Sequence, residues 1–241
     1  SVAGPLVILN TIMADSLDYI ATELEAAKAK TPAALGAAVQ KVIQKIIKNH
    51  GRVIFNGDNY APAWHKEAAK RGLPNAANTA AAIPAAQNKA NEDVLAKHHV
   101  LSKREFHSRN EIYLEKYIKD VMIEARLAYE IAKTMILPAA VAYQKLLAET
   151  SGSLKALGKK HCTSVLDELC ELVAEFQVRI GLLRAAIAHE GNGDVAAHAM
   201  HCRSQIVPAM DAVREIADAL EGVVADEHWP LPTYQEMLFI K

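Results

Sequence analysis

The fold is decided by one stretch of fifty residues, LSKREFHSRNEIYLEKYIKDVMIEARLAYEIAKTMILPAAVAYQKLLAET, which runs from Leu101 to Thr150. It contains no glycine and a single proline, Pro138. Ser102 and Glu105 have the spacing of a capping box, in which each side chain accepts a hydrogen bond from the other residue's amide. The stretch therefore predicts one long helix that begins after Ser102. Pro138 is expected to bend it, because proline cannot donate to the Thr134 carbonyl.

Apolar residues recur in this stretch at steps of three and four, which places them on one face of a helix. They are Leu114, Ile118, Val121, Met122, Ala125, Ala128, Tyr129, Ala132, Ile136, Ala139, Tyr143 and Leu146. A helix of this length spans roughly 70 Å, which is more than the width of a compact domain of this size. Other elements must therefore pack against both of its ends.

The composition favours the all-α fold class. Of the 241 residues, 51% are apolar and only 5% are aromatic, and few segments alternate as a strand does. The 27 Lys and Arg balance 28 Asp and Glu, so no net charge attracts nucleic acid or an anionic membrane. No apolar run reaches the roughly 18 residues of a membrane span. We expect a soluble, cytoplasmic protein, and three dispersed cysteines suit a reducing compartment.

Shorter elements are expected before the long helix. Helices are predicted up to Lys30, from Thr31-Pro32 to about Ile47, and from Pro62 to Arg71. Val53-Ile54-Phe55 is the one run that predicts a strand, and residues 73–100 are expected to be irregular, with helical pieces broken at Pro84.

Two more long helices are expected after it. Ser151-Gly152-Ser153 predicts a tight break before a helix over residues 154–189, and Asp194 caps a third helix that ends near Ala225. Short connections predict an antiparallel three-helix bundle. The apolar tail that begins at His228-Trp229-Pro230 is expected to dock on this chain or on a neighbour, with a second capping box at Thr233 and Glu236.

The motifs predict no active site. No glutamate is followed three residues later by histidine, which excludes the di-metal carboxylate bundles. His198, His201 and Cys202 lie on one helix face and could bind zinc with His161 or Cys162, but packing cysteine and solvated histidines explain the same spacing, so no metal is assigned.

Two further patterns also have simpler explanations. Gly152 and Gly158-Lys159-Lys160 miss the phosphate-binding loop in spacing, and no strand precedes them. The pairs His98-His99 and Trp64-His65 could supply a base, yet no nucleophile or orienting carboxylate accompanies them. No catalytic, cofactor-binding or metal residue is therefore predicted.

Several stretches together resemble a known family. These are Ser1-Val2-Ala3-Gly4-Pro5 with the following helix to Asp15, Val53-Ile54-Phe55-Asn56-Gly57-Asp58, Arg71-Gly72-Leu73-Pro74-Asn75, Ser108-Arg109-Asn110-Glu111-Ile112-Tyr113, and Trp229-Pro230-Leu231-Pro232-Thr233-Tyr234. They resemble the C-terminal part of type III glutamine synthetases, which ligate ammonia to glutamate with ATP and a divalent metal, Mg or Mn.

The resemblance implies a division of the chain and a role. Residues 1–125 resemble the C-terminal helical part of the catalytic domain, and residues 126–241 resemble a bundle and docking tail found in type III enzymes. The family's catalytic, metal and nucleotide residues correspond to positions before Ser1, so none transfers to a number here. The chain alone is expected to be inactive and to serve assembly, with the rest of its parent and further copies as partners. The alternative is an independent helical scaffold or adaptor that binds a partner protein.

Overall fold

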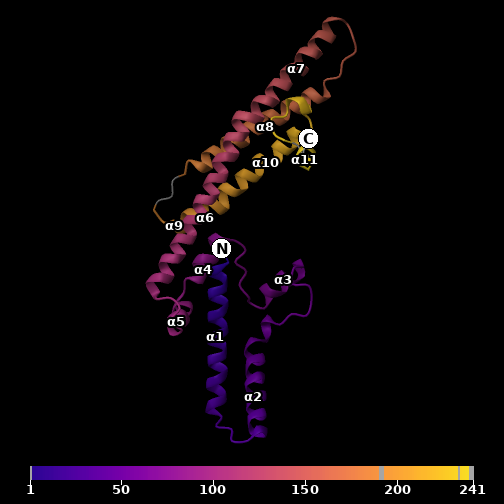
Figure 1. Cartoon of the computed structure of the whole chain (residues 1–241). Helices are drawn as coiled ribbons and strands as arrows, with labels where there is room; N and C mark the ends of the chain where they lie inside the picture. The colour runs from indigo at the N-terminus through magenta and orange to yellow at the C-terminus, as the bar shows by residue number, and fades with distance from the viewer. Residues whose placement is uncertain (1, 190–192, 233, 239–241) are drawn as a thin grey trace. The chain divides into compact units, whose positions relative to one another are not determined.

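The computed structural model describes residues 2–189, 193–232 and 234–238, and within these it contains helices and no strand (Figure 1). The predicted all-α fold class is confirmed. The elements are α1 Ala3–Ala26, α2 Pro32–His50, the 3-10 turn η1 Gly51–Val53, α3 Pro62–Lys70, α4 Thr79–Ala86, α5 Lys89–Lys97, α6 Lys103–Ile131, the π-helical turn η2 Ala132–Ile136, α7 Leu137–Ala156, α8 Ser164–Ile187, α9 Val195–His201, the π-helical turn η3 Cys202–Ile206, α10 Val207–Glu221, the 3-10 turn η4 Asp226–His228 and α11 Tyr234–Leu238.

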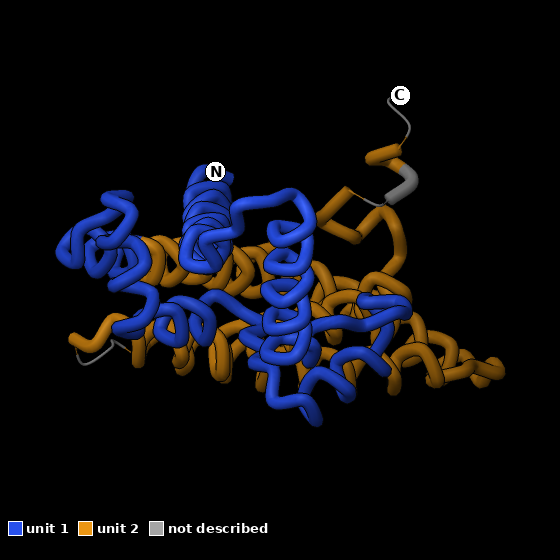
Figure 2. Tube along the Cα trace, turned by 90° about the horizontal axis from the view of Figure 1, so that it is seen from below, with its two compact units in different colours: residues 1–112 blue, residues 113–241 orange. Residues whose placement is uncertain are grey.

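The chain divides into two compact units, residues 1–112 and 113–241, which Figure 2 colours separately. The boundary between them falls inside α6. The family-based division between residues 125 and 126 is a different kind of boundary and stays a prediction. None of the described helices combines the length and apolar content of a transmembrane segment.

Helix starts in both units follow their caps. In unit 1 the Thr31 hydroxyl accepts from the Ala34 amide at 3.2 Å, as predicted. The capping box of α6 is confirmed, since the Ser102 amide donates to Glu105 at 2.8 Å and the Glu105 amide to Ser102 at 3.3 Å. In unit 2, Asp194 accepts from the Ala196 amide at 2.9 Å. Local side-chain chemistry therefore determines where these helices begin.

Two predictions for unit 1 are wrong. The predicted strand is absent, because Val53 ends the 3-10 turn η1 and Arg71 donates to the carbonyls of Arg52 and Ile54, which a strand would pair with a neighbouring strand. Pro84 does not break its helix but lies inside α4, which ends two residues later at Ala86. So close to the C-terminus the proline leaves only a short segment of helix to disturb.

The long helix of unit 2 passes through the break predicted at Ser151-Gly152-Ser153, which is therefore wrong. It ends where Gly158 adopts a left-handed φ of +66° and the Lys159 amide donates to the Leu154 carbonyl at 2.9 Å. This is the geometry of a glycine C-cap. Gly152 is tolerated inside α7 at a cost of about 1 kcal/mol. The following helix, α8, accordingly begins at Ser164 and not at residue 154.

The π-helical turn η2 accommodates Pro138. The Leu137 amide donates to the Ala132 carbonyl, five residues back, so one extra residue is inserted into the helix just before the proline. The turn moves the buried stripe by one position. Ala140 is fully buried and Leu147 packs against the core, whereas the uninterrupted period predicted Ala139 and Leu146.

A second π-helical turn, η3, repeats the arrangement seventy residues later. The stretch CRSQIVPA at residues 202–209 is similar to AKTMILPA at residues 132–139. Position by position, both have a basic residue second, a hydroxyl residue third, isoleucine fifth, an aliphatic residue sixth and proline seventh. The Val207 amide donates to the Cys202 carbonyl, again five residues back and directly before a proline, Pro208. The same sequence solution therefore produces the same backbone feature twice.

One buried core is shared by the three long helical segments of unit 2. Its fully buried members include Ala132 from η2, Phe176 and Leu183 from α8, and Ile206 and Leu220 from η3 and α10. Helix α8 packs against both α7 and α10. The finer description as an antiparallel three-helix bundle stays a prediction, which this shared core supports.

The beginning of the tail packs on the same core. Trp229 and Leu231 contact it, and Tyr143 of α7 lies 5.6 Å from His228, ring centre to ring centre. The beginning of the tail, residues 228–231, thus docks on this chain, one of the two options that the sequence left open. The predicted second capping box requires Thr233, which lies outside the described residues.

Candidate functional site

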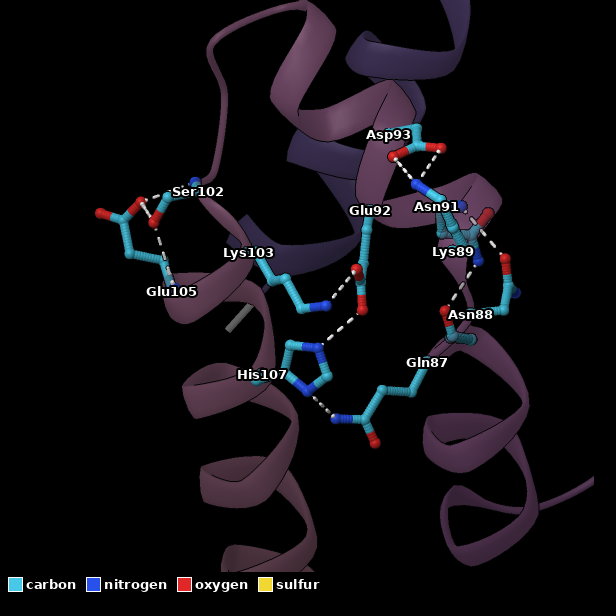
Figure 3. A network of polar contacts seen from close by, with 11 residues as sticks. Gln87, Asn88, Lys89, Asn91, Glu92, Asp93, Ser102, Lys103, Glu105 and His107 are labelled. Carbon is cyan, nitrogen blue, oxygen red and sulfur yellow. Dashed lines mark hydrogen bonds and ion pairs between the residues drawn. The ribbon is translucent and has the colours of Figure 1, made fainter.

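The polar groups that converge most closely in unit 1 join α5 to α6 (Figure 3). His107 Nε2 lies 2.6 Å from Glu92 Oε1, and His107 Nδ1 lies 2.8 Å from the side-chain Nε2 of Gln87. Lys103 adds an ion pair to the second Glu92 oxygen at 3.3 Å. The hydrogen bond from His107, followed by that from Lys103, holds the pKa of Glu92 below its usual range.

The tautomer of His107 follows from its partners. The glutamine nitrogen can only donate, so Nδ1 accepts, and the proton on Nε2 is donated to Glu92. Both ring nitrogens are engaged within the protein, and neither is left to take a proton from a substrate. The network is therefore suited to holding α5 and α6 together and not to acid–base catalysis.

A second cluster joins α1 to α5. Lys97 Nζ lies 2.8 Å from Asp15 Oδ1 and 2.7 Å from Asp18 Oδ2, and His98 Nε2 lies 3.0 Å from Asp15 Oδ1. Hydrogen bonds from Lys97 and then His98 lower the pKa of Asp15. The sequence offered no orienting carboxylate for His98; the structure supplies one from 83 residues away.

Asp15, Asp18 and His98 form the one group of three potential metal ligands within the described residues, their ligand atoms lying within 4.8 Å of one another. The Lys97 ammonium already supplies a positive charge to both carboxylates. A divalent ion would have to displace this lysine. The cluster is an ion-paired contact between α1 and α5.

The zinc ligands considered from sequence are not brought together. His161 and Cys162 precede α8, whereas His198 and Cys202 follow it, and the 24 residues of α8 separate them by about 36 Å along its axis. Cys202 is fully buried in the core of unit 2. His201 Nε2 lies 3.0 Å from the Ala186 carbonyl, so it donates there, and its ring lies 4.3 Å from that of His189.

The other sequence candidates have structural roles. Gly152 lies within α7 and Gly158 ends it, so neither belongs to a phosphate-binding loop. Trp64 stacks on Phe55 with ring centres 4.4 Å apart, and its neighbour His65 is exposed on α3. His99 adopts a left-handed φ of +53° just after α5. The clusters that do form lay beyond sequence reasoning, because no spacing rule relates Asp15 to His98 or Glu92 to His107.

A hollow of about 410 Å³ lies in unit 2 between α6, η2, α10 and the tail. It is lined mainly by apolar side chains, including Ile131, Met210 and Trp229. The polar groups at it include the ion pair of Arg214 with Asp218, 2.8 Å apart. The hollow lies beneath the docked tail and is best described as a packing space of that tail.

Comparisons of the sequence with known proteins point to one family. Residues 38–155 match the family model of the glutamine synthetase C-terminal domain. The type-3 glutamine synthetase of Dictyostelium discoideum is 31% identical over 98% of this chain and 33% of its own length. The glutamine synthetases of Butyrivibrio fibrisolvens and Bacteroides fragilis are 32% and 27% identical over 83% and 99% of this chain.

The chain spans about a third of the length of the curated relatives it matches. The match covers both units, since the family model includes most of α2 through nearly all of α7 and the relatives extend over almost the whole chain. The resemblance seen in the sequence is thereby confirmed. The chain belongs to the family of the glutamine synthetase C-terminal domain and corresponds to a C-terminal part of such an enzyme.

Proposed function

We propose that the chain serves packing and assembly in a larger glutamine synthetase, here called the parent, and that catalysis resides in the part of the parent upstream of residue 1. The parent ligates ammonia to glutamate with ATP and a divalent metal, Mg or Mn, in glutamine biosynthesis. This proposal rests on the relatives, which are named glutamine synthetases and of whose length the chain matches about a third.

One structural observation carries the proposal. One turn of α1 is apolar on every side, since the four consecutive residues Leu6, Val7, Ile8 and Leu9 point in four directions around the helix, and all four are exposed. Ile12 and Met13 extend this surface, and Thr11 is the one buried residue of α1. A helix that is apolar all round is a buried core helix. The cover that α1 needs is assigned to the upstream part of the parent.

The polar clusters of unit 1 fit this role. The Asp15–Lys97–Asp18 contact fixes α1 to α5, and the Glu92–His107 contact fixes α5 to α6. Because these contacts fix α1 to α5, and α5 to α6, the exposed apolar residues of α1 have a defined position within unit 1. The upstream part of the parent thus packs against an ordered surface.

The experiment compares three proteins: the full-length parent, its upstream part alone, which ends just before residue 1, and the 241-residue chain. γ-Glutamyl hydroxamate formation is measured with ATP and with Mg or Mn. We expect turnover from the parent and none from the 241-residue chain. Turnover by the chain alone would overturn the proposal. A reading frame without an upstream part, or a parent without synthetase activity, would support the independent scaffold or adaptor instead.

A further inference from the structure

Residues 53–60, from the last residue of η1 to shortly before α3, display apolar side chains that are exposed in unit 1. Tyr60 is 94% exposed, and Val53 and Ile54 are also exposed. A tyrosine ring presents a large apolar surface and a hydroxyl, and burial of such rings dominates many interfaces. We call residues 53–60 the Tyr60 loop.

An arginine fixes the base of the Tyr60 loop. Arg71 Nη1 donates to the Ile54 carbonyl at 2.8 Å and to the Arg52 carbonyl at 3.2 Å. The guanidinium is held by Glu67 at 2.7 Å and lies over the Trp64 ring, 5.6 Å from its centre. The backbone that carries Val53 and Ile54 is therefore tied to α3.

The tip of the loop is equally well determined. Phe55 stacks on Trp64, and a Cβ at Gly57 would lie 2.7 Å from an edge carbon of the Phe55 ring, so only glycine fits there. Asp58 Oδ1 accepts from the Tyr60 amide at 2.9 Å and closes the turn directly before the exposed ring. The backbone at Tyr60 is thus fixed by a hydrogen bond, and the Tyr60 ring extends into solvent.

A loop whose backbone is already ordered loses less conformational freedom on binding than a disordered one, and an exposed aromatic ring on it supplies a large surface to bury. Asn56, Asp58 and Asn59 precede Tyr60 in the loop and can supply the polar rim that such an anchor has. The loop lies inside the matched residues 38–155 and so belongs to the family domain. The relatives are about three times as long as this chain, so most of the parent lies outside it.

We propose that the Tyr60 loop docks on the upstream part of the parent, inserting Tyr60 into an apolar pocket that offers a hydrogen-bond acceptor to the phenol. The inference rests on the proposed function, because the partner is the remainder of that enzyme. It adds a second contact, separate in the chain from the apolar face of α1.

The test uses the full-length parent with the photo-reactive amino acid p-benzoylphenylalanine in place of Tyr60, followed by mass spectrometry of the cross-linked peptides. We expect cross-links to residues upstream of residue 1. The same probe in place of Lys66, which is exposed on α3, is the control and is expected to give few cross-links there. Cross-links from position 60 that stay within residues 1–241, or none at all, would overturn the inference.

Two substitutions in the parent give a second readout. We expect Y60A to speed amide exchange in the pocket peptide by roughly tenfold or more, and Y60F to have a smaller effect. Equal exchange in wild type and Y60A would contradict the docking. The synthetase assay is scored separately. An active parent without these cross-links refutes the docking alone, and an inactive parent with them refutes the proposed function alone.

Discussion

Deleting Met135 tests whether the π-helical turn η2 exists because of Pro138. The turn inserts one extra residue before the proline, so removing Met135 restores the count of a regular α-helix and leaves Ala140 and Leu147 in place. With Pro138 present, the proline would then lie inside a regular helix. It would lack one hydrogen bond and clash with the carbonyl four positions back, at a cost of about 3 kcal/mol.

The magnitude comes from a double-mutant cycle. Met135 is itself exposed, so losing its side chain removes little buried surface. We expect the deletion to lower the free energy of unfolding by about 3 kcal/mol with Pro138 and by less than about 1 kcal/mol in the Pro138→Ala background. With a urea dependence of about 2 kcal/mol per molar, the deletion should lower the midpoint by about 1.5 M with Pro138 and by less than about 0.5 M in the Pro138→Ala background.

The assay is urea unfolding followed by the fluorescence of Trp229, which packs on the core of unit 2. Trp64→Phe makes Trp229 the sole tryptophan, because the chain has two. Deletion of Lys145, an exposed residue further along α7, is the control. It moves Leu147 out of register, and Pro138→Ala should not rescue it. Equal destabilisation by the Met135 deletion in both backgrounds would refute this explanation of η2.

Three further outcomes follow from the described contacts. Leu147→Ala should destabilise unit 2 by about 2 kcal/mol, and Leu146→Ala, at a position 44% exposed, by less than about 0.5 kcal/mol in the same urea assay; the reverse order would mean an uninterrupted helix. Gly57→Ala should destabilise unit 1 by about 1–3 kcal/mol because its Cβ meets Phe55, whereas Gly51→Ala, with open space around its Cβ, should not; Trp64 fluorescence in Trp229→Phe reports both, and similar midpoints would contradict the packing. Because its pKa is lowered in the folded state, Glu92 stabilises unit 1 above the unfolded glutamate pKa of about 4.3, and this contribution is lost as the pH falls through the lower folded pKa. The urea midpoint of the wild type should therefore fall between about pH 5 and about pH 3, and that of Glu92→Gln should fall less. Parallel curves of midpoint against pH for the two proteins would argue against this.

Elements controlled by neighbouring residues could be predicted from the sequence. Thr31, Ser102 and Asp194 cap their helices by hydrogen bonds to amides two or three residues away, so the signal and the structure lie in the same few residues. The all-α class followed from the low aromatic content and the scarcity of alternating segments. The apolar spacing needed no tertiary knowledge as far as Ile136.

Beyond that point the prediction failed where non-local or competing effects decide. The proline at position 138 acts through an inserted residue, which moves the buried positions from Ala139 and Leu146 to Ala140 and Leu147. The end of α7 depends on which of two glycines takes a left-handed φ, and Gly158 does so, not Gly152. The strand predicted at residues 53–55 does not form, because Arg71 and not a neighbouring strand donates to the Ile54 carbonyl.

The polar clusters were invisible for a simpler reason. Asp15 meets Lys97 and His98, and Glu92 meets His107, only after separate helices have packed. No sequence spacing encodes either meeting. The family resemblance, by contrast, could be recognised directly, because its stretches are spread over nearly the whole chain.

The central claim, that α1 is a core helix completed by the upstream part of the parent, can be measured at Met13. This side chain is 61% exposed in the chain, and Met237 near the other end is 58% exposed and serves as the comparison in the same digest. Peroxide oxidation of both methionines is followed by mass spectrometry in the 241-residue chain and in the full-length parent. We predict that Met13 oxidises as readily as Met237 in the chain alone and becomes strongly protected in the parent. Oxidation of Met13 at the same rate in both proteins would contradict the account.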